Sequence, residues 1–260
     1  MLTKSVVGLI KSEMAEKYAP TYQCILKQIT GGNLIHADET KGVVLGGGHY
    51  VWVFANMTTV AYVYSESRES AILEDLLDGF KGVLVSDFYA AYDSVPCPQQ
   101  KCLIHLMRDI NEDLNRNPFD EELKAIAGRF GALLREIVET VDRYGLKARH
   151  LGKHRRSAER FIQYVAGMNC ATEVGLALQK RIEKNSDRLF TFLSYDGVPW
   201  NNNNAEHAIQ AFARLRNVIN TSSPKGTRDY ATLLSIQQTL RYRGQPFLEF
   251  MRSGEMNLPA

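Results

Sequence analysis

The alternation of hydrophobic and polar positions in the first half of the chain predicts a mixture of helices and strands. Apolar residues recur at helical spacing over residues 3–18, and Gly31-Gly32 then separates this predicted helix from a group of strands. The predicted strands cover residues 34–40, 50–56, 60–64 and 83–86, with a further short strand after Pro98. Residues 50–56 and 60–64 are rich in β-branched and aromatic residues, as strands prefer.

The spacing of these segments predicts how some of them are arranged. Few residues separate 50–56 from 60–64, so we expect these two strands to form an antiparallel hairpin. Residues 83–86 form a brief apolar strand of the kind that is buried on both faces. Helices are predicted between and after these strands, over residues 69–78 and 103–116.

The second half of the chain has a mainly helical pattern. From residue 119 to about residue 192, apolar side chains form helical stripes. Further helices are predicted over residues 203–217 and 228–242, with a loop at 221–226 between them and a last turn after Pro246. This order of elements indicates an α/β or α+β domain that carries an all-helical insertion.

Composition and charge exclude some classes of protein. The chain has 260 residues, 45% hydrophobic and 23% charged, which is typical of a globular protein with a substantial core. A formal net charge of +2 does not by itself indicate a nucleic-acid partner. The sequence shows no apolar run of membrane-span length and no signal-peptide pattern, and its four cysteines are scattered. We therefore expect a soluble cytoplasmic protein.

Three acidic residues are the strongest candidates for chemistry. Asp38 lies in the first predicted strand, Asp87 directly follows an apolar strand, and Glu206 begins a helix after four asparagines. Hard oxygen ligands of this kind suit Mg²⁺, and two such ions can hold the attacking and the leaving oxygen of a phosphate. The three acids therefore predict phosphoryl transfer on nucleic acid.

Each acid also has a purely structural interpretation. Asp38 could cap a turn at the end of its strand, and Asp87 could cap a short helix over residues 88–92. Glu206 lies three residues after Asn203, as in a capping box in which the glutamate reaches back to the helix start. Taken one at a time, none of the three acids establishes a metal site.

Four segments of the chain occur in an order that is similar to one protein family. They are His36-Ala-Asp38-Glu-Thr40, Ser86-Asp87-Phe-Tyr-Ala-Ala-Tyr92, Cys102-Leu-Ile-His105-Leu-Met-Arg108 and Asn202-Asn203-Asn-Ala-Glu206. Together they resemble the catalytic core of the DDE class of insertion-sequence transposases, and most of all the insertion-sequence-sixty-six type. The resemblance runs from about residue 20 to the C-terminus.

The resemblance implies a fold, an activity and a set of site residues. The fold would be a ribonuclease H-like mixed sheet with an all-helical insertion before the last catalytic helix. Asp38, Asp87 and Glu206 would be the catalytic residues and would hold two Mg²⁺ ions, which Mn²⁺ could replace. The residues expected around them are His105, Asn202 and Asn203.

The implied activity is hydrolysis of DNA phosphodiesters followed by strand transfer. The partners would be the transposon ends and the target DNA, and the active form would be a homo-oligomer in the cytoplasm, associated with the nucleoid. The predicted division of the chain is an N-terminal helical remnant or linker (1–30), the first part of the core (31–118), a helical insertion (119–200) and C-terminal helices that complete the core (201–260).

The chain departs from the family pattern in two respects. The family often has arginine directly after the last acid and again four positions beyond that acid, where this chain has His207 and Gln210. Family members usually carry a longer N-terminal portion with DNA-binding helices, whereas this chain begins 37 residues before Asp38. A truncated copy, a separate reading frame or the catalytic part alone would account for the difference.

Two alternative functions stay open from the sequence. One is a nuclease of the same fold that does not transpose, which the asparagine-rich segment and the large insertion argue against. The other is an inactive remnant that only binds DNA or a partner protein. The intact acidic triad argues against that remnant, while the short N-terminal portion favours it.

Basic residues elsewhere predict contacts with DNA phosphates. Residues 147–156 contain no acid, and as a DNA contact they would give sequence-independent affinity that falls with salt, although such a stretch is usually a solvated helix face. The DNA-binding candidates are Arg149, Lys153, Arg155, Arg156, Arg214, Arg216 and Lys225. A zinc site at Cys97, Cys102 and His105 is disfavoured, because this spacing lacks a clear fourth ligand.

Overall fold

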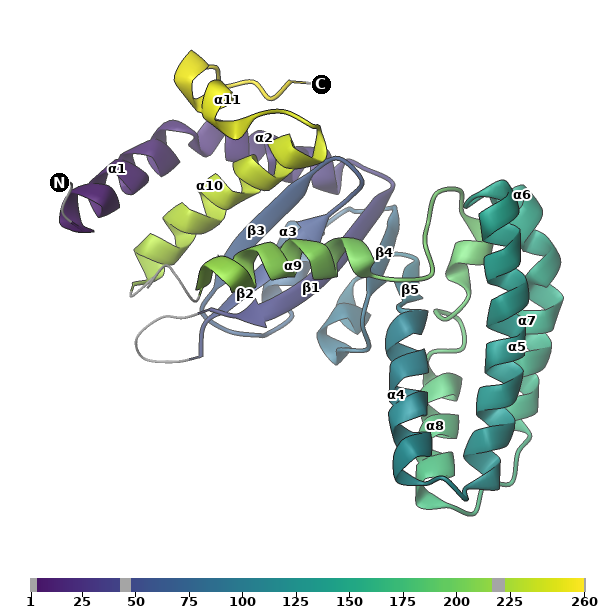
Figure 1. Cartoon of the computed structure of the whole chain (residues 1–260). Helices are drawn as coiled ribbons and strands as arrows, with labels where there is room; N and C mark the ends of the chain where they lie inside the picture. The colour runs from purple at the N-terminus through teal and green to yellow at the C-terminus, as the bar shows by residue number, and fades with distance from the viewer. Residues whose placement is uncertain (1–3, 43–47, 217–222, 260) are drawn as a thin grey trace. The chain divides into compact units, whose positions relative to one another are not determined.

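The computed structural model describes residues 4–42, 48–216 and 223–259, with only the backbone described at residues 4, 215 and 216. Figure 1 shows the helices and strands of the chain. Internal contacts divide the chain into two compact units. Unit 1 consists of Met1–Leu84, Tyr89–Cys97 and Asn203–Ala260, and unit 2 consists of Val85–Phe88 and Pro98–Asn202. No helix within the described ranges is long and apolar enough to cross a membrane.

The fold is a mixed α/β fold with a five-stranded sheet in the order β3-β2-β1-β4-β5. The strands are β1 (Leu34–Lys41), β2 (Tyr50–Ala55), β3 (Val60–Ser65), β4 (Val83–Ser86) and β5 (Gln99–Lys101). Strand β2 pairs antiparallel with both β1 and β3, which confirms the predicted hairpin. Every predicted strand is present, and the β-branched and aromatic residues of β2 are almost all buried in the sheet.

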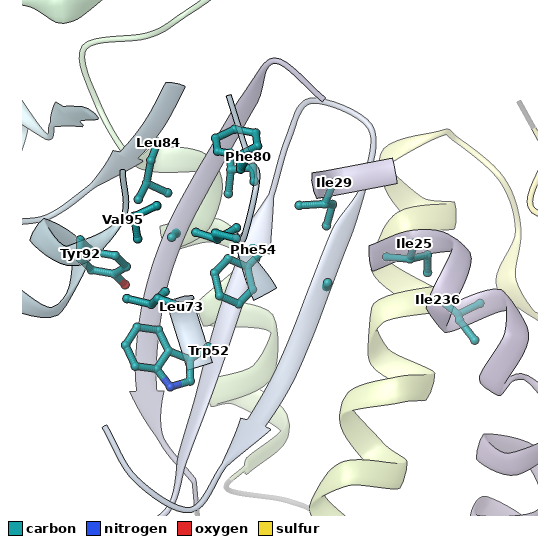
Figure 2. Close-up of a cluster of buried hydrophobic side chains, with 14 of the residues drawn as sticks. Ile25, Ile29, Trp52, Phe54, Leu73, Phe80, Leu84, Tyr92, Val95 and Ile236 are labelled. Carbon is teal, nitrogen blue, oxygen red and sulfur yellow. The ribbon is translucent and has the colours of Figure 1, made fainter. Parts of the chain in front are cut away.

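One face of the sheet packs against the first hydrophobic core (Figure 2). Trp52 and Phe54 of β2 are fully buried in it, together with Ile25 of helix α2 (Ala19–Thr30). The predicted N-terminal helix is α1 (Lys4–Lys17), and α2 is a second helix that sequence analysis missed. Proline in the first turn and buried positions four residues apart are the signals that mark α2.

The other face packs against a second core beneath helices α9 (Asn203–Arg216) and α10 (Pro224–Tyr242). Helix α9 contacts β1 and β2, and α10 contacts β3. The Tyr62 hydroxyl donates a hydrogen bond of 2.7 Å to the Ala208 carbonyl, and the Tyr62 ring stacks on Phe212. These contacts attach α9 to the sheet through buried groups.

Helix α10 also covers the outer edge of β3. The Thr239 hydroxyl accepts the Val60 N–H at 3.0 Å and donates to the Val60 carbonyl at 3.1 Å. The Ser235 hydroxyl accepts the Tyr62 N–H at 2.9 Å. An edge strand presents unpaired backbone groups, and here buried side chains of α10 satisfy them.

Unit 2 is mainly helical, as the pattern from residue 119 to residue 192 predicts. Its helices are α4 (Leu103–Arg116), α5 (Glu121–Tyr144), α6 (Ala148–Leu151), α7 (Arg155–Ala166) and α8 (Glu173–Lys184), with 3-10 turns η2 (Gly152–His154) and η3 (Thr191–Ser194). Apolar positions of α5 are buried against α7, where Phe130 and Phe161 have ring centroids 5.6 Å apart. The stripe seen in the sequence is therefore the core of this unit.

The short elements differ from prediction mainly at their ends. Helix α3 (Ala71–Leu76) is shorter than predicted, and α11 (Phe247–Ser253) is the predicted last turn. Helix α10 begins at Pro224 rather than near residue 228, because the Ser223 hydroxyl caps it by accepting the Gly226 N–H at 3.1 Å. The predicted loop at 221–226 is wrong from Pro224 onward, and its first two residues lie outside the described part of the chain.

The edge contact between α10 and β3 generates a stability prediction. We expect Thr239→Val to lower the free energy of unfolding by about 1–3 kcal/mol, because the buried Val60 N–H and carbonyl lose their partner. The matched control is Thr227→Val in the same helix, where a buried hydroxyl bonds only the Ser223 carbonyl of its own first turn. Urea unfolding of both variants measures the difference, and equal losses would contradict the role of Thr239.

Buried His154 generates a second prediction. Its Nε2 lies 2.8 Å from the Thr140 hydroxyl, and burial, assisted by the Lys153 charge, lowers the pKa of His154 below its ordinary value. The unfolded chain binds a proton near pH 6.5 while the folded chain resists it, so stability should fall as the pH drops below about 6.5. His154→Gln keeps a polar partner for Thr140 and should weaken this pH dependence. Urea unfolding at pH 7.5 and 5.5 tests it; an unchanged dependence would contradict it.

Candidate functional site

Asp38 points to the face of the sheet that α9 covers. In the antiparallel register Asp38 is opposite Val53, and Val53 belongs to the second core beneath α9. Side chains directly opposite each other in such a pair project to the same face. Asp38 is partly buried, and its Oδ1 accepts the N–H of Glu39 at 2.8 Å.

The neighbouring acid, Glu39, points to the other face, as side-chain alternation predicts. Its partner across the strands is Trp52, which lies in the first core. The Glu39 carboxylate forms an ion pair with Arg68 and accepts the Tyr92 hydroxyl at 2.6 Å. Glu39 therefore links β1 to two other segments of unit 1, while Asp38 points to the α9 side.

Glu206 lies in the first turn of α9 and is partly buried. The start of this helix is fixed by Asn204, whose side-chain amide donates to the Asn56 carbonyl at 3.1 Å and whose carbonyl accepts the Tyr242 hydroxyl at 3.4 Å. Because α9 packs on β1, Glu206 and Asp38 belong to elements in contact on one side of the sheet. Both acids are in unit 1.

Asp87 directly follows β4 and belongs to unit 2. The next 3-10 helix, η1 (Ala90–Ser94), begins three residues later with Tyr89 at its N-cap, so the interpretation of Asp87 as the cap of this helix is wrong. The residue before it, Ser86, is fully buried and accepts the Cys102 N–H at 2.8 Å. Asp87 therefore directly follows a strand end whose backbone is fixed by this hydrogen bond.

Lys101 places a buried amino group within the same unit. It is fully buried in β5, and its Nζ lies 3.4 Å from the Ser86 hydroxyl. Lysine is rarely buried unless other groups stabilise its charge. Sequence analysis missed Lys101, because its only signal was a charge in a very short strand.

The predicted neighbours of the acids fall in both units. His105 is in the first turn of α4, with a ring nitrogen within 4.8 Å of the Cys102 sulfur. The backbone N–H of buried Asn202 donates to that sulfur at 3.3 Å, so His105 and Asn202 lie near one another in unit 2. Asn203 is exposed and starts α9 in unit 1.

The thiol of Cys97 does not support the disfavoured zinc site. Burial raises the pKa of the Cys97 thiol to about 11. Cys97 is not among the described residues whose ligand atoms lie close enough together to hold a metal ion. Packing accounts for this residue, which lies against the first core.

The DNA-binding candidates of the basic stretch 147–156 are exposed but have acidic neighbours. Its four predicted DNA-binding residues are Arg149, Lys153, Arg155 and Arg156, and all are exposed. Lys153 shares a cavity with Glu136 and Glu139. Arg155 lines a groove of about 570 Å³ together with Glu159 and Asp187. Residues 147–156 include no acid, but in the folded chain carboxylates of other residues lie beside them.

The other basic candidates lie on α9 and α10. Lys225 is in the first turn of α10 rather than in a loop, 70% exposed and 3.0 Å from the Asp229 carboxylate. The side chain of Arg216 lies outside the described part of the structure. Arg214 is exposed and lines a groove between the two helices.

This groove contains residues that sequence analysis did not connect. Its volume is about 380 Å³, and its lining consists of Asn204, His207, Gln210, Ala211, Arg214, Gln238, Arg241 and Tyr242. His207 and Gln210 had been singled out only as departures from the family pattern. The missed signal is a polar stripe at spacings of three and four residues along each helix.

Comparison with known proteins agrees with the arrangement of these segments. The model of the family described as Transposase IS66 family matches residues 2–228, a range that includes Asp38, Asp87 and Glu206. No curated protein and no solved structure matches the chain. Because the family model covers most of the sequence, the resemblance found in the short segments is confirmed: the chain belongs to the IS66 family of transposases.

Proposed function

We propose that this transposase hydrolyses DNA phosphodiesters and transfers DNA strands with the help of two Mg²⁺ ions. Asp38, Asp87 and Glu206 are the carboxylates that would hold the ions, on a sheet of the ribonuclease H-like type. The observation that supports this best is that Asp38 points to the face covered by α9, and that α9 carries Glu206 in its first turn.

The chemistry of the three side chains fits the proposed ions. Carboxylate oxygens are the hard ligands that Mg²⁺ prefers, and Mn²⁺ accepts the same donors. Asp38 and Glu206 are both partly buried, and the Oε1 atom of Glu206 is shielded from solvent. Asp87 is also partly buried, at the end of a fully buried strand.

The proposed reaction is a substitution at phosphorus. The oxygen of water, or later of a DNA 3′-hydroxyl, forms a bond to phosphorus, the bond to the leaving 3′ oxygen breaks, and that oxygen takes up a proton. Two bound Mg²⁺ ions supply a lowered pKa for the attacking oxygen and charge neutralisation for the leaving one. The three carboxylates act as ligands, and no covalent bond to the protein forms.

Neighbouring groups would position this site. His105 and Asn202 lie near one another in the unit that carries Asp87, and Asn203 starts the helix that carries Glu206. The buried backbone contact between Ser86 and Cys102 restricts how far Asp87 can move. The DNA partner, the homo-oligomeric active form and the nucleoid association are part of the same proposal.

The role of Asp87 has a direct test. Asp87→Asn should reduce Mg²⁺-dependent nicking of plasmid DNA by about a hundredfold or more, because several kcal/mol of charge stabilisation depend on the ligands. Folding should be retained, since the variant removes a negative charge from a site that gathers several. The matched control is Asp142→Asn, at an exposed position of α5 in the same unit. Wild-type cleavage by the Asp87 variant, in a preparation free of other nucleases, would refute the assignment.

The basic stretch has its own test. If Arg155 and Arg156 both contact phosphates, replacing both with glutamine should lower the slope of log affinity against log salt by about two. Binding to duplexes of two unrelated sequences should weaken equally, because phosphate contacts carry no sequence information. Fluorescence anisotropy over a salt series measures the slope. An unchanged slope would assign this stretch to a solvated helix face.

A further inference from the structure

The groove between α9 and α10 has the composition of an anion site. Its α9 side presents Asn204, His207, Gln210 and Arg214, and its α10 side presents Gln238, Arg241 and Tyr242. No aspartate or glutamate is among the lining residues that the structure describes. In this respect it differs from the grooves beside Lys153 and Arg155, each of which contains two carboxylates.

Gln238 is the first sign that the groove is built to hold a ligand. The residue is 6% exposed, and its side-chain amide makes no hydrogen bond to any residue in the described part of the chain. Its amide is not among the fully shielded side-chain polar groups that lack a partner, so solvent reaches it through the groove that Gln238 lines. A ligand in the groove would take the place of water in hydrogen bonds with this amide.

The two arginines are the second sign. Arg214 and Arg241 are exposed and come from different helices, yet neither forms an ion pair or hydrogen bond within the described ranges. Guanidinium groups that line one cavity without a carboxylate create a positive potential there. Their planar donor geometry suits the oxygens of a phosphate.

The location of the groove indicates which phosphate it takes. Gln210 lies one helical turn beyond Glu206, and His207 is the next residue after Glu206. A strand whose phosphate is held against Arg214 and Arg241 would therefore continue past the start of α9. A DNA strand can place one phosphate against Arg214 and Arg241 and also extend past the start of α9. A free phosphate can only occupy the position against the two arginines.

We propose that the α9–α10 groove binds a backbone phosphodiester of DNA, through the guanidinium groups of Arg214 and Arg241 and the amide of Gln238. This inference rests on the proposed function only in taking DNA as the ligand. His207 and Gln210 extend the same surface toward Glu206. The groove is formed by residues of unit 1 alone.

The test measures binding of the full-length chain to labelled single-stranded and duplex oligonucleotides in EDTA, so that no metal-dependent cleavage contributes. Arg241→Gln should lower affinity for DNA about tenfold, as expected for loss of a hydrogen-bonded charge, and should reduce the salt slope by about one. The matched control is Arg252→Gln, which removes an exposed arginine of α11 outside the groove and should change affinity less than twofold.

Gln238→Leu separates a binding role from a structural one. The leucine removes an amide that makes no hydrogen bond within the described part of the chain, so the variant should be about as stable as the wild type in urea unfolding. It should nevertheless bind DNA several-fold more weakly. Lower stability together with wild-type DNA affinity would mean that Gln238 is structural and would overturn its assignment to the site.

Competition separates DNA from other phosphates. Inorganic phosphate and a mononucleotide should displace labelled DNA only at concentrations far above that of unlabelled oligonucleotide. If they displace it equally well, the groove is a small-anion site and the proposal is overturned. Equal affinities of the Arg241 and Arg252 variants would also overturn it, even when the wild type cleaves DNA. Weak binding by the Arg241 variant supports the groove even if Asp87→Asn leaves cleavage intact.

Discussion

Side-chain alternation along β1 is the constraint on which the candidate site depends. Two adjacent acids, Asp38 and Glu39, project to opposite faces because β1 is fully extended and paired with β2. Glu39 is held by Arg68 and Tyr92 on the first-core face, which fixes the register of β1. A slip of one residue would exchange the two acids, so the ion pair of Glu39 protects the orientation of Asp38. The second core then places α9, and with it Glu206, over the face to which Asp38 points.

Local patterns in the sequence predicted most elements, and the failures have physical causes. Residues 103–116 and 83–86 form the predicted helix and strand because periodicity, burial and end signals agree there. Helix α2 was missed although Ile25 and Ile29 carry the right spacing, and α10 starts early because a serine–proline pair caps it. The acids were identifiable because each follows a recognisable segment. The face to which Asp38 points was not identifiable, because it depends on the register in which β1 pairs with β2.

Charge along the sequence and charge in space give different pictures of this protein. The run 147–156 has the highest density of basic residues, but folding brings Glu136, Glu139 and Asp187 beside it. The groove between α9 and α10 brings together Arg214 and Arg241, which come from these two consecutive helices. No acid is among its described lining residues. A count of local charge therefore points to the first surface, while the folded arrangement favours the second as a phosphate site.

The central claim is that Asp38, Asp87 and Glu206 hold a pair of metal ions. Diffraction from crystals soaked in Mn²⁺, recorded for its anomalous signal, tests this most directly because it locates the ions without relying on activity. The account predicts two anomalous peaks about 4 Å apart, with ligands from all three carboxylates. Peaks bound elsewhere on the chain, or a peak ligated by one acid while the other two point away, would contradict it.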